Sequence, residues 1–303
     1  MKNIQNFLNR FKNRNGQTPV ILEMLYRYND DSVGMKAAAL SYYLIFSIFP
    51  MLILLSMLIG SLHIDVASLN GILDKFLPED MIEVLKSYLV YVTDSYSSTL
   101  MSFAVIFSIY FPWRFIKSLM ESIRTSFGLG KSTHLLRDLL RQLLCTILLP
   151  LTITLCLILI IFGQNVITWI CSFLLPGTVR LSAFLLSLWQ VLRFAAAALI
   201  MGFSLGILYE ASMDKPVKIR ELFPGILFSI AAWVLASMIF SFYVENFANY
   251  SVIYGAIGGF MVLLLWLYLS GSIFILGSEL NAILLKRKHP QDNPENPESS
   301  EIG

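Results

Sequence analysis

Arg193 is the residue whose type and position suggest chemistry most clearly. It lies in an apolar run at residues 181–209, within about 3 Å of the run's midpoint at the rise of an α-helix. Charged side chains at such a depth in a membrane usually face a bundle interior or a wet cavity, because hydrocarbon solvates them poorly. Glu245 and Glu279 lie near opposite membrane faces, each roughly 18–20 Å from the centre by the same rise. The arginine therefore has no carboxylate at a matching depth.

Two interpretations of Arg193 stay open. In the first, it meets an anionic group such as a lipid phosphate, which a guanidinium binds through two hydrogen bonds. In the second, it hydrogen-bonds backbone carbonyls and hydroxyls and fixes the helix bundle. Gln190 shares its helical face three residues earlier. With Ser47 and Tyr43 from another apolar run, these residues form the polar, anion-binding cleft that we predict.

Glu279 is the second ionisable residue of interest. Together with Asn281 it follows Gly277 at the end of the sixth apolar run. We expect both side chains to lie in the membrane interface and to bond to basic inner loops. A proton-coupling carboxylate is the alternative for Glu279.

Catalytic and metal-binding patterns are not found in the sequence. It contains no H-E-x-x-H, no G-x-S-x-G, no P-loop and no dinucleotide fingerprint. His63, His134 and His289 stand in separate segments, and the three cysteines form no C-x-x-C pair. We therefore predict no enzyme, no catalytic residue, no metal and no cofactor. Nucleic-acid binding is not expected either, because the basic residues follow a membrane topology.

The elements that must position these side chains are apolar runs of membrane length. Hydrophobic residues make up 56% of the chain and charged residues 14%, against about 25% charged in soluble domains. A membrane helix needs about 20 apolar residues. Six runs meet or approach this length, at 37–60, 99–113, 139–162, 181–209, 222–244 and 253–277. The prediction is an all-α, polytopic membrane bundle with about six spans, of which 99–113 is the shortest.

Lysine and arginine counts predict the orientation of these spans. Successive hydrophilic segments carry 6, 2, 6, 1, 3, 0 and 3 of them. Basic loops stay on the cytoplasmic side. We therefore expect an inner-membrane, multi-pass protein with both termini in the cytoplasm and the lipid bilayer, anionic lipids included, as its partner. The oligomeric state is left open by the sequence.

The segments outside the predicted spans also show patterns. Residues 1–35 suit a cytoplasmic amphipathic segment in which Thr18-Pro19 opens a helix. Residues 61–98 suit an extracytoplasmic helical hairpin, between the parts of a membrane domain at 36–288. A further amphipathic stretch covers 115–127, and the tail at 289–303 has a disordered composition.

Prolines and glycines mark special points within the runs. Prolines 50, 112, 150 and 224 each remove a backbone donor and could break or kink a span. Small residues spaced by four favour close helix contacts. The glycines with this spacing, predicted to pack helices, are Gly202, Gly206, Gly255 and Gly259.

Two stretches resemble the YihY/BrkB family of bacterial membrane proteins. One is K-A-A-A-L-S-Y-Y-L-I-F-S-I-F-P at residues 36–50, and the other runs from Y-G-A-I-G-G at 254–259 through L-W-L-Y-L at 265–269 to G-S-E-L-N-A at 277–282. The resemblance covers about residues 18–288 and includes the six-span layout. The matching motif positions are Ser47, Pro50, Gly255, Gly259, Gly277 and Glu279.

The resemblance implies a role in the cell envelope without a settled mechanism. The family's older ribonuclease label implies a metal-binding cluster, which this sequence lacks. Our prediction is a protein that moves or binds an anionic lipid or envelope precursor near Arg193. The alternative is a scaffold without transport activity that docks envelope machinery through 61–98 or its basic inner loops.

Overall fold

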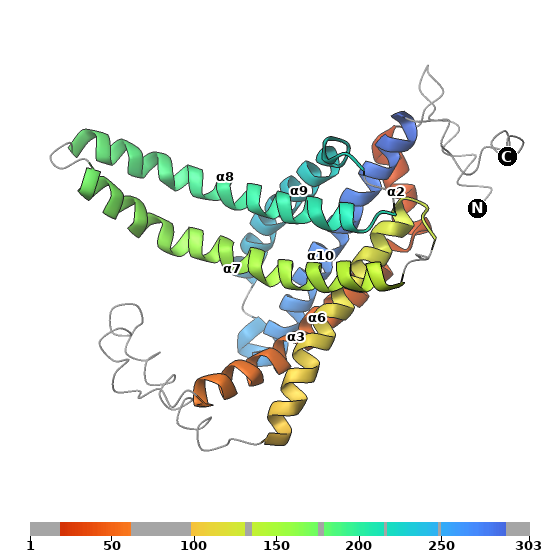
Figure 1. The fold of residues 1–303 in the computed structure, drawn as a ribbon, viewed down its shortest axis with the longest axis horizontal. Helices are drawn as coiled ribbons and strands as arrows, with labels where there is room; N and C mark the ends of the chain where they lie inside the picture. Colours follow the sequence, from red (N-terminus) through yellow and green to blue (C-terminus); the bar gives the residue numbers. More distant parts are fainter. Residues whose placement is uncertain are drawn as a thin grey trace, which may run out of the picture. The chain divides into compact units, whose positions relative to one another are not determined.

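Every element of the computed structural model is an α-helix in the part of the chain that it describes, residues 19–61, 98–130, 135–174, 179–214, 217–247 and 250–288 (Figure 1). The helices are α2 (Val20–Asp30), α3 (Val33–Ser61), α6 (Ser98–Ser126), α7 (Leu135–Leu174), α8 (Val179–Ala211), α9 (Ile219–Phe247) and α10 (Tyr250–Lys288). This confirms the predicted all-α class. The predicted hairpin at 61–98 and the tail at 289–303 fall almost entirely outside the described residues.

Six of these helices are long and apolar enough to cross a membrane, which confirms the predicted number of spans. Their apolar segments are Val33–Leu54, Met101–Ser126, Leu135–Leu159, Leu192–Ala211, Ile219–Val244 and Ile257–Lys288. A helix satisfies its own backbone hydrogen bonds, which is the condition for crossing hydrocarbon.

The second span is longer than the sequence predicts. α6 has 29 residues and continues through Pro112 into the stretch at 115–127, which was expected as a separate amphipathic element. Proline removes one backbone donor but does not by itself end a helix whose neighbouring bonds form. Pro50, Pro150 and Pro224 likewise lie inside continuous helices. The start of α2 also differs from the prediction, because Pro19 is the N-cap and no side chain caps this end.

The chain divides into two compact units. The first comprises residues 1–40 and 116–303, and the second comprises residues 41–115. In the first unit α10 packs against α9 and α2, and α8 packs against α7 and α9. Figure 1 shows α7 and α8 as a long helical pair. In the second unit α3 and α6 meet through aromatic rings, with the Phe46 and Phe111 centroids 5.7 Å apart.

The tightest helix contact at a described glycine of the first unit lies between α9 and α10. A Cβ atom added to Gly277 would collide with Ser229 Oγ and lie 2.6 Å from Tyr209 Oη and 2.8 Å from the Gly225 carbonyl oxygen. The buried Tyr209 hydroxyl donates to the carbonyl of Phe274 at 2.7 Å. Glycine is needed at position 277 because the two backbones approach too closely for any side chain.

Asn281 joins the same two helices one turn further along α10. Its Oδ1 accepts a hydrogen bond from the Gly225 backbone N–H at 2.7 Å, and its Nδ2 donates to the Leu222 carbonyl at 2.9 Å. The side chain is fully buried. These two bonds join this side chain of α10 to the backbone of the first two turns of α9.

Candidate functional site

Arg193 lies near the middle of α8, among side chains that face outward. Leu192 is 49% exposed and Phe194 is 56% exposed. The buried Arg193 Nε has no hydrogen-bond partner in the part of the chain that the structure describes, and the Arg193 Cζ lies 4.9 Å from the centroid of the Phe194 ring. Trp189, one helical turn earlier, has a buried Nε1 that is also unbonded. The described part of α8 thus carries two unbonded N–H donors, four residues apart, within an apolar stretch.

The other residues of the predicted cleft are distributed over both units. The side chain of Gln190 lies outside the description of the structure. Tyr43, in the second unit, accepts a hydrogen bond from Arg114 Nη2 at 2.9 Å. Ser47 is buried and donates to the Leu44 carbonyl at 2.6 Å. A shared cleft with Arg193 therefore stays a prediction.

The packing glycines differ in their surroundings. A Cβ on Gly202 would lie 2.9 Å from Ile230 Cδ1, and one on Gly206 would lie 3.2 Å from Ile226 Cδ1, both on α9. Gly259 has no described atom within 4 Å of such a Cβ. Gly255 lies in α10, and its surroundings are outside the described residues. Pro50 is buried in α3.

Glu279 is fully buried and is bonded to the N-terminal segment. Arg27 Nη1 of α2 lies 3.1 Å from Glu279 Oε2 and also donates to the Ser126 carbonyl at 2.9 Å. The expected bond from Glu279 to a basic inner loop is not what the structure shows. The expectation for Asn281 is also wrong, since it is buried against α9. A single sequence could not place α2 against α10, because this contact joins residues that are 252 positions apart.

Two more pairs fasten α2 to α10. Arg287 Nη2 donates to Glu23 Oε2 at 2.7 Å. The hydroxyls of Tyr28 and Tyr268 lie 2.9 Å apart. The hydrogen bond with Tyr268 is the main cause of a raised pKa at Tyr28. The helix therefore lies on the end of α10 through polar contacts, while Ile21 is 73% exposed.

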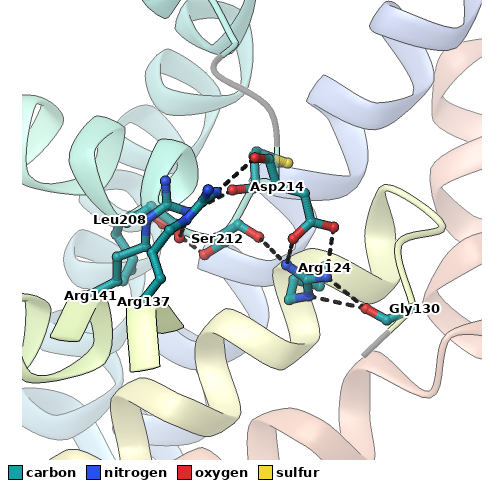
Figure 2. A network of polar contacts seen from close by, with 9 residues as sticks. Arg124, Gly130, Arg137, Arg141, Leu208, Ser212 and Asp214 are labelled. Carbon is teal, nitrogen blue, oxygen red and sulfur yellow. Dashed lines mark hydrogen bonds and ion pairs between the residues drawn. The ribbon is translucent and has the colours of Figure 1, made fainter. Parts of the chain in front are cut away.

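Arg124, Arg137 and Arg141 form polar contacts with the short segment that follows α8 (Figure 2). Arg124 binds both carboxylate oxygens of Asp214, at 2.8 and 2.9 Å, and donates to the Ser212 carbonyl at 3.1 Å. The hydrogen bond from Arg124 holds the pKa of the Asp214 carboxyl below its ordinary value. Arg137 donates to the carbonyl of Asp214 at 2.8 Å, and Arg141 donates to that of Met213 at 2.7 Å.

These bonds satisfy the carbonyls of residues 212–214, which directly follow α8, and Arg141 also donates to the carbonyl of Ala211, the last residue of the helix, at 3.3 Å. The last four carbonyls of an α-helix have no partner within the helix, and its C-terminus attracts cations. In the sequence these arginines served only to predict the orientation of the spans. Their role as partners of the α8 terminus depends on folding that brings α6, α7 and α8 together, so no local motif could have shown it.

The comparisons with known proteins give the family. A model described as "Virulence factor BrkB" matches residues 24–302. The chain belongs to the BrkB virulence factor family. This confirms the resemblance drawn from the two motifs, and with six membrane-length helices it makes the chain a multi-pass membrane protein.

Relatives within this family carry general names. The chain is similar to "Putative ribonuclease-like protein YfkH" of Bacillus subtilis (strain 168), with 30% identity over 90% of this chain and 98% of the relative. It is also similar to "UPF0761 membrane protein PBPRA3489" of Photobacterium profundum, with 26% identity over 88% of this chain and 80% of the relative. No solved structure matches the chain.

The word "ribonuclease-like" describes the Bacillus protein and is not carried over to this chain. Among the residues described for this chain, no group of three or more His, Cys, Asp or Glu side chains could hold a metal ion. Metal-dependent phosphodiester cleavage needs such a group to activate water and to stabilise charge. The absence of enzymatic activity stays a prediction from the sequence.

Proposed function

We propose that this protein binds an anionic lipid or lipid-linked envelope precursor at Arg193 in the inner membrane, with both termini in the cytoplasm. The observation that carries the proposal is the unbonded Arg193 Nε in the middle of α8. Within the described residues, the aromatic partner of its guanidinium is the exposed Phe194, which offers a ring face but no counter-charge.

The physical argument rests on charge in an apolar setting. A guanidinium in an apolar stretch is costly unless an anion or another acceptor pairs with it. A phosphate or phosphate diester offers charge-assisted hydrogen bonds of matching geometry. Leu192 and Phe194, both exposed, offer apolar surface for acyl chains beside it. A lipid with an anionic headgroup provides both chemistries in one molecule.

The test is lipid selectivity of variants at position 193. The purified protein is reconstituted in mixed phosphatidylglycerol and phosphatidylcholine, and bound lipid is measured by native mass spectrometry after detergent extraction. We expect wild type to retain phosphatidylglycerol, and Arg193→Gln to lose most of that preference. Arg193→Lys should keep part of it, because an ammonium keeps the charge but not the two-pronged geometry.

The matched control is Arg220→Gln. Arg220 is an exposed arginine near the start of α9, so its loss removes the same charge from a solvated position. Equal phosphatidylglycerol retention in wild type and Arg193→Gln, with unchanged helical circular dichroism, would refute anion binding at Arg193. That result would favour the scaffold interpretation, for which crosslinking partners should depend on residues 61–98.

A further inference from the structure

Three buried side-chain atoms, two on α10 and one in the first turn of α3, have no hydrogen-bond partner among the described residues. They are Glu279 Oε1, Lys36 Nζ and Ser272 Oγ. Ser272 and Glu279 are seven residues apart and so occupy one face of α10. α3 packs on α10 beside this face through Leu40, whose Cδ1 lies 3.4 Å from a Cβ built on Gly271. Lys36 precedes this contact by one helical turn.

Charged groups approach Glu279 from each element around it. Arg27 comes from α2 and binds Oε2. Asp31, in the turn between α2 and α3, acts on Glu279 electrostatically. Lys36, from the first turn of α3, experiences the fields of both Asp31 and Glu279. From α6, the Ser126 hydroxyl acts on Glu279 through a side-chain hydrogen bond, and it also bonds the Ser278 hydroxyl at 2.9 Å.

Among the described residues, the Glu279 Oε1 atom and the Lys36 Nζ atom are buried and have no hydrogen-bond partner. Burying charged groups in this way is costly, because neither recovers the hydrogen bonds of water. Protonation of the Glu279 carboxylate removes its negative charge and with it the cost of burying that charge. If Glu279 takes up a proton from water, its Oε1 becomes a neutral hydroxyl or carbonyl oxygen, and the Arg27 bond to Oε2 can persist.

We propose that Glu279, with Lys36 as its charged neighbour, is a proton-binding site between α2, α3 and α10. The reaction is reversible addition of one solvent proton to the Glu279 carboxylate, with no other bond made or broken. Arg27 is 17% exposed on its side chain, whereas Glu279 is 0% exposed, so α2 lies between the site and solvent. Such a site would allow a proton gradient to act on this end of the helix bundle. It is independent of lipid binding at Arg193.

The test is infrared difference spectroscopy of reconstituted protein during a pH titration. A protonated carboxyl gives a C=O stretch that a carboxylate lacks. Because all 20 Asp and Glu side chains give such a band when protonated, the Glu279 component is the wild-type spectrum minus that of Glu279→Gln. We expect this component to be reversible with pH, to shift in D₂O and to be present in wild type and absent from Glu279→Gln. The matched control is Glu221→Gln, which removes a carboxylate that forms an exposed ion pair with Lys288 at 2.7 Å. This control should keep the band.

A second variant tests the role of the neighbour. Lys36→Met removes a positive charge that favours the carboxylate form, so the midpoint of the band should move to higher pH. If Glu279→Gln does not fold, Glu279→Asp still places a carboxyl at the site, and the band should change frequency rather than disappear. A wild-type band unaffected by both Glu279 variants, which means that no Glu279 component exists at any pH at which the protein stays folded, would overturn the proposal. An unmoved midpoint in Lys36→Met would overturn the part assigned to Lys36.

Discussion

Replacing Gly277 with alanine places a methyl group in the tight contact between α9 and α10. The added carbon would lie 2.6 Å from Tyr209 Oη and 2.8 Å from the Gly225 carbonyl oxygen, and it would collide with Ser229 Oγ. Ordinary contacts need about 3.5 Å, so these atoms are nearly an ångström too close. The Gly225 oxygen is backbone and the Tyr209 hydroxyl is bonded to Phe274, so neither can yield freely. The helices must therefore separate.

The cost can be worked out from this geometry. Overpacking a tight contact costs about 1–3 kcal/mol. Loss of the Tyr209 hydrogen bond to Phe274 adds roughly 0.5–1.5 kcal/mol. We expect Gly277→Ala to lower the free energy of unfolding by about 2–4 kcal/mol. The measurement is equilibrium unfolding in mixed bicelles and denaturing detergent, followed by circular dichroism and tryptophan fluorescence.

Gly259→Ala is the matched control on the same helix. It has no described atom within 4 Å of the added methyl, so the substitution should be neutral or stabilise by up to about 1 kcal/mol through helix propensity. The double variant Gly277→Ala, Ser229→Ala removes one of the colliding oxygens and should recover part of the loss. Equal stabilities of Gly277→Ala and Gly259→Ala would refute the close approach of α9 and α10.

Two further predictions concern the polar contacts of the helix ends. Asn281→Ala removes the side chain that bonds the Gly225 N–H and the Leu222 carbonyl. It should lower the free energy of unfolding by about 2–4 kcal/mol in the same measurement. The exposed control Arg220→Gln should lower it by no more than about 0.5 kcal/mol. Asp214, whose carboxyl has a lowered pKa in the folded state, should contribute stability that is present above its unfolded pKa and lost as the pH falls through its folded value. Unfolding titrations between neutral and strongly acidic pH should therefore show a weaker acid-side loss in Asp214→Asn than in wild type, and identical pH profiles would contradict the pairing with Arg124.

Local sequence patterns were sufficient for the helices but not for their ends. Apolar length predicted all six spans, because hydrocarbon requires self-satisfied helices. The pattern was misleading at Pro112, where a polar and aromatic stretch continues one helix instead of starting another. The end of the second span depends on packing around residues 115–123, which are largely buried, and periodicity cannot show this.

The candidate sites were also predicted only in part, because the residues could be recognised from the sequence but their contacts could not. Arg193 and Glu279 were visible as ionisable residues in apolar runs. The groups around Glu279 were not, since Arg27 and Lys36 lie about 240–250 positions away in sequence and were counted only as basic residues of the segment before the first span. Asn281 was placed wrongly and Tyr209 was not singled out, for a related reason. Their value lies in bonding the backbone of another helix, and no spacing rule in a single sequence reports such contacts.

Lipid retention by the Arg193→Gln variant is the most direct test of the proposed function. Wild type and variant, each purified from the same membrane lipid mixture, are compared for phosphatidylglycerol bound per protein by native mass spectrometry. The account predicts that wild type carries bound anionic lipid and that Arg193→Gln loses most of it, while Arg220→Gln retains the wild-type amount. Retention of the full amount by a folded Arg193→Gln protein would contradict it.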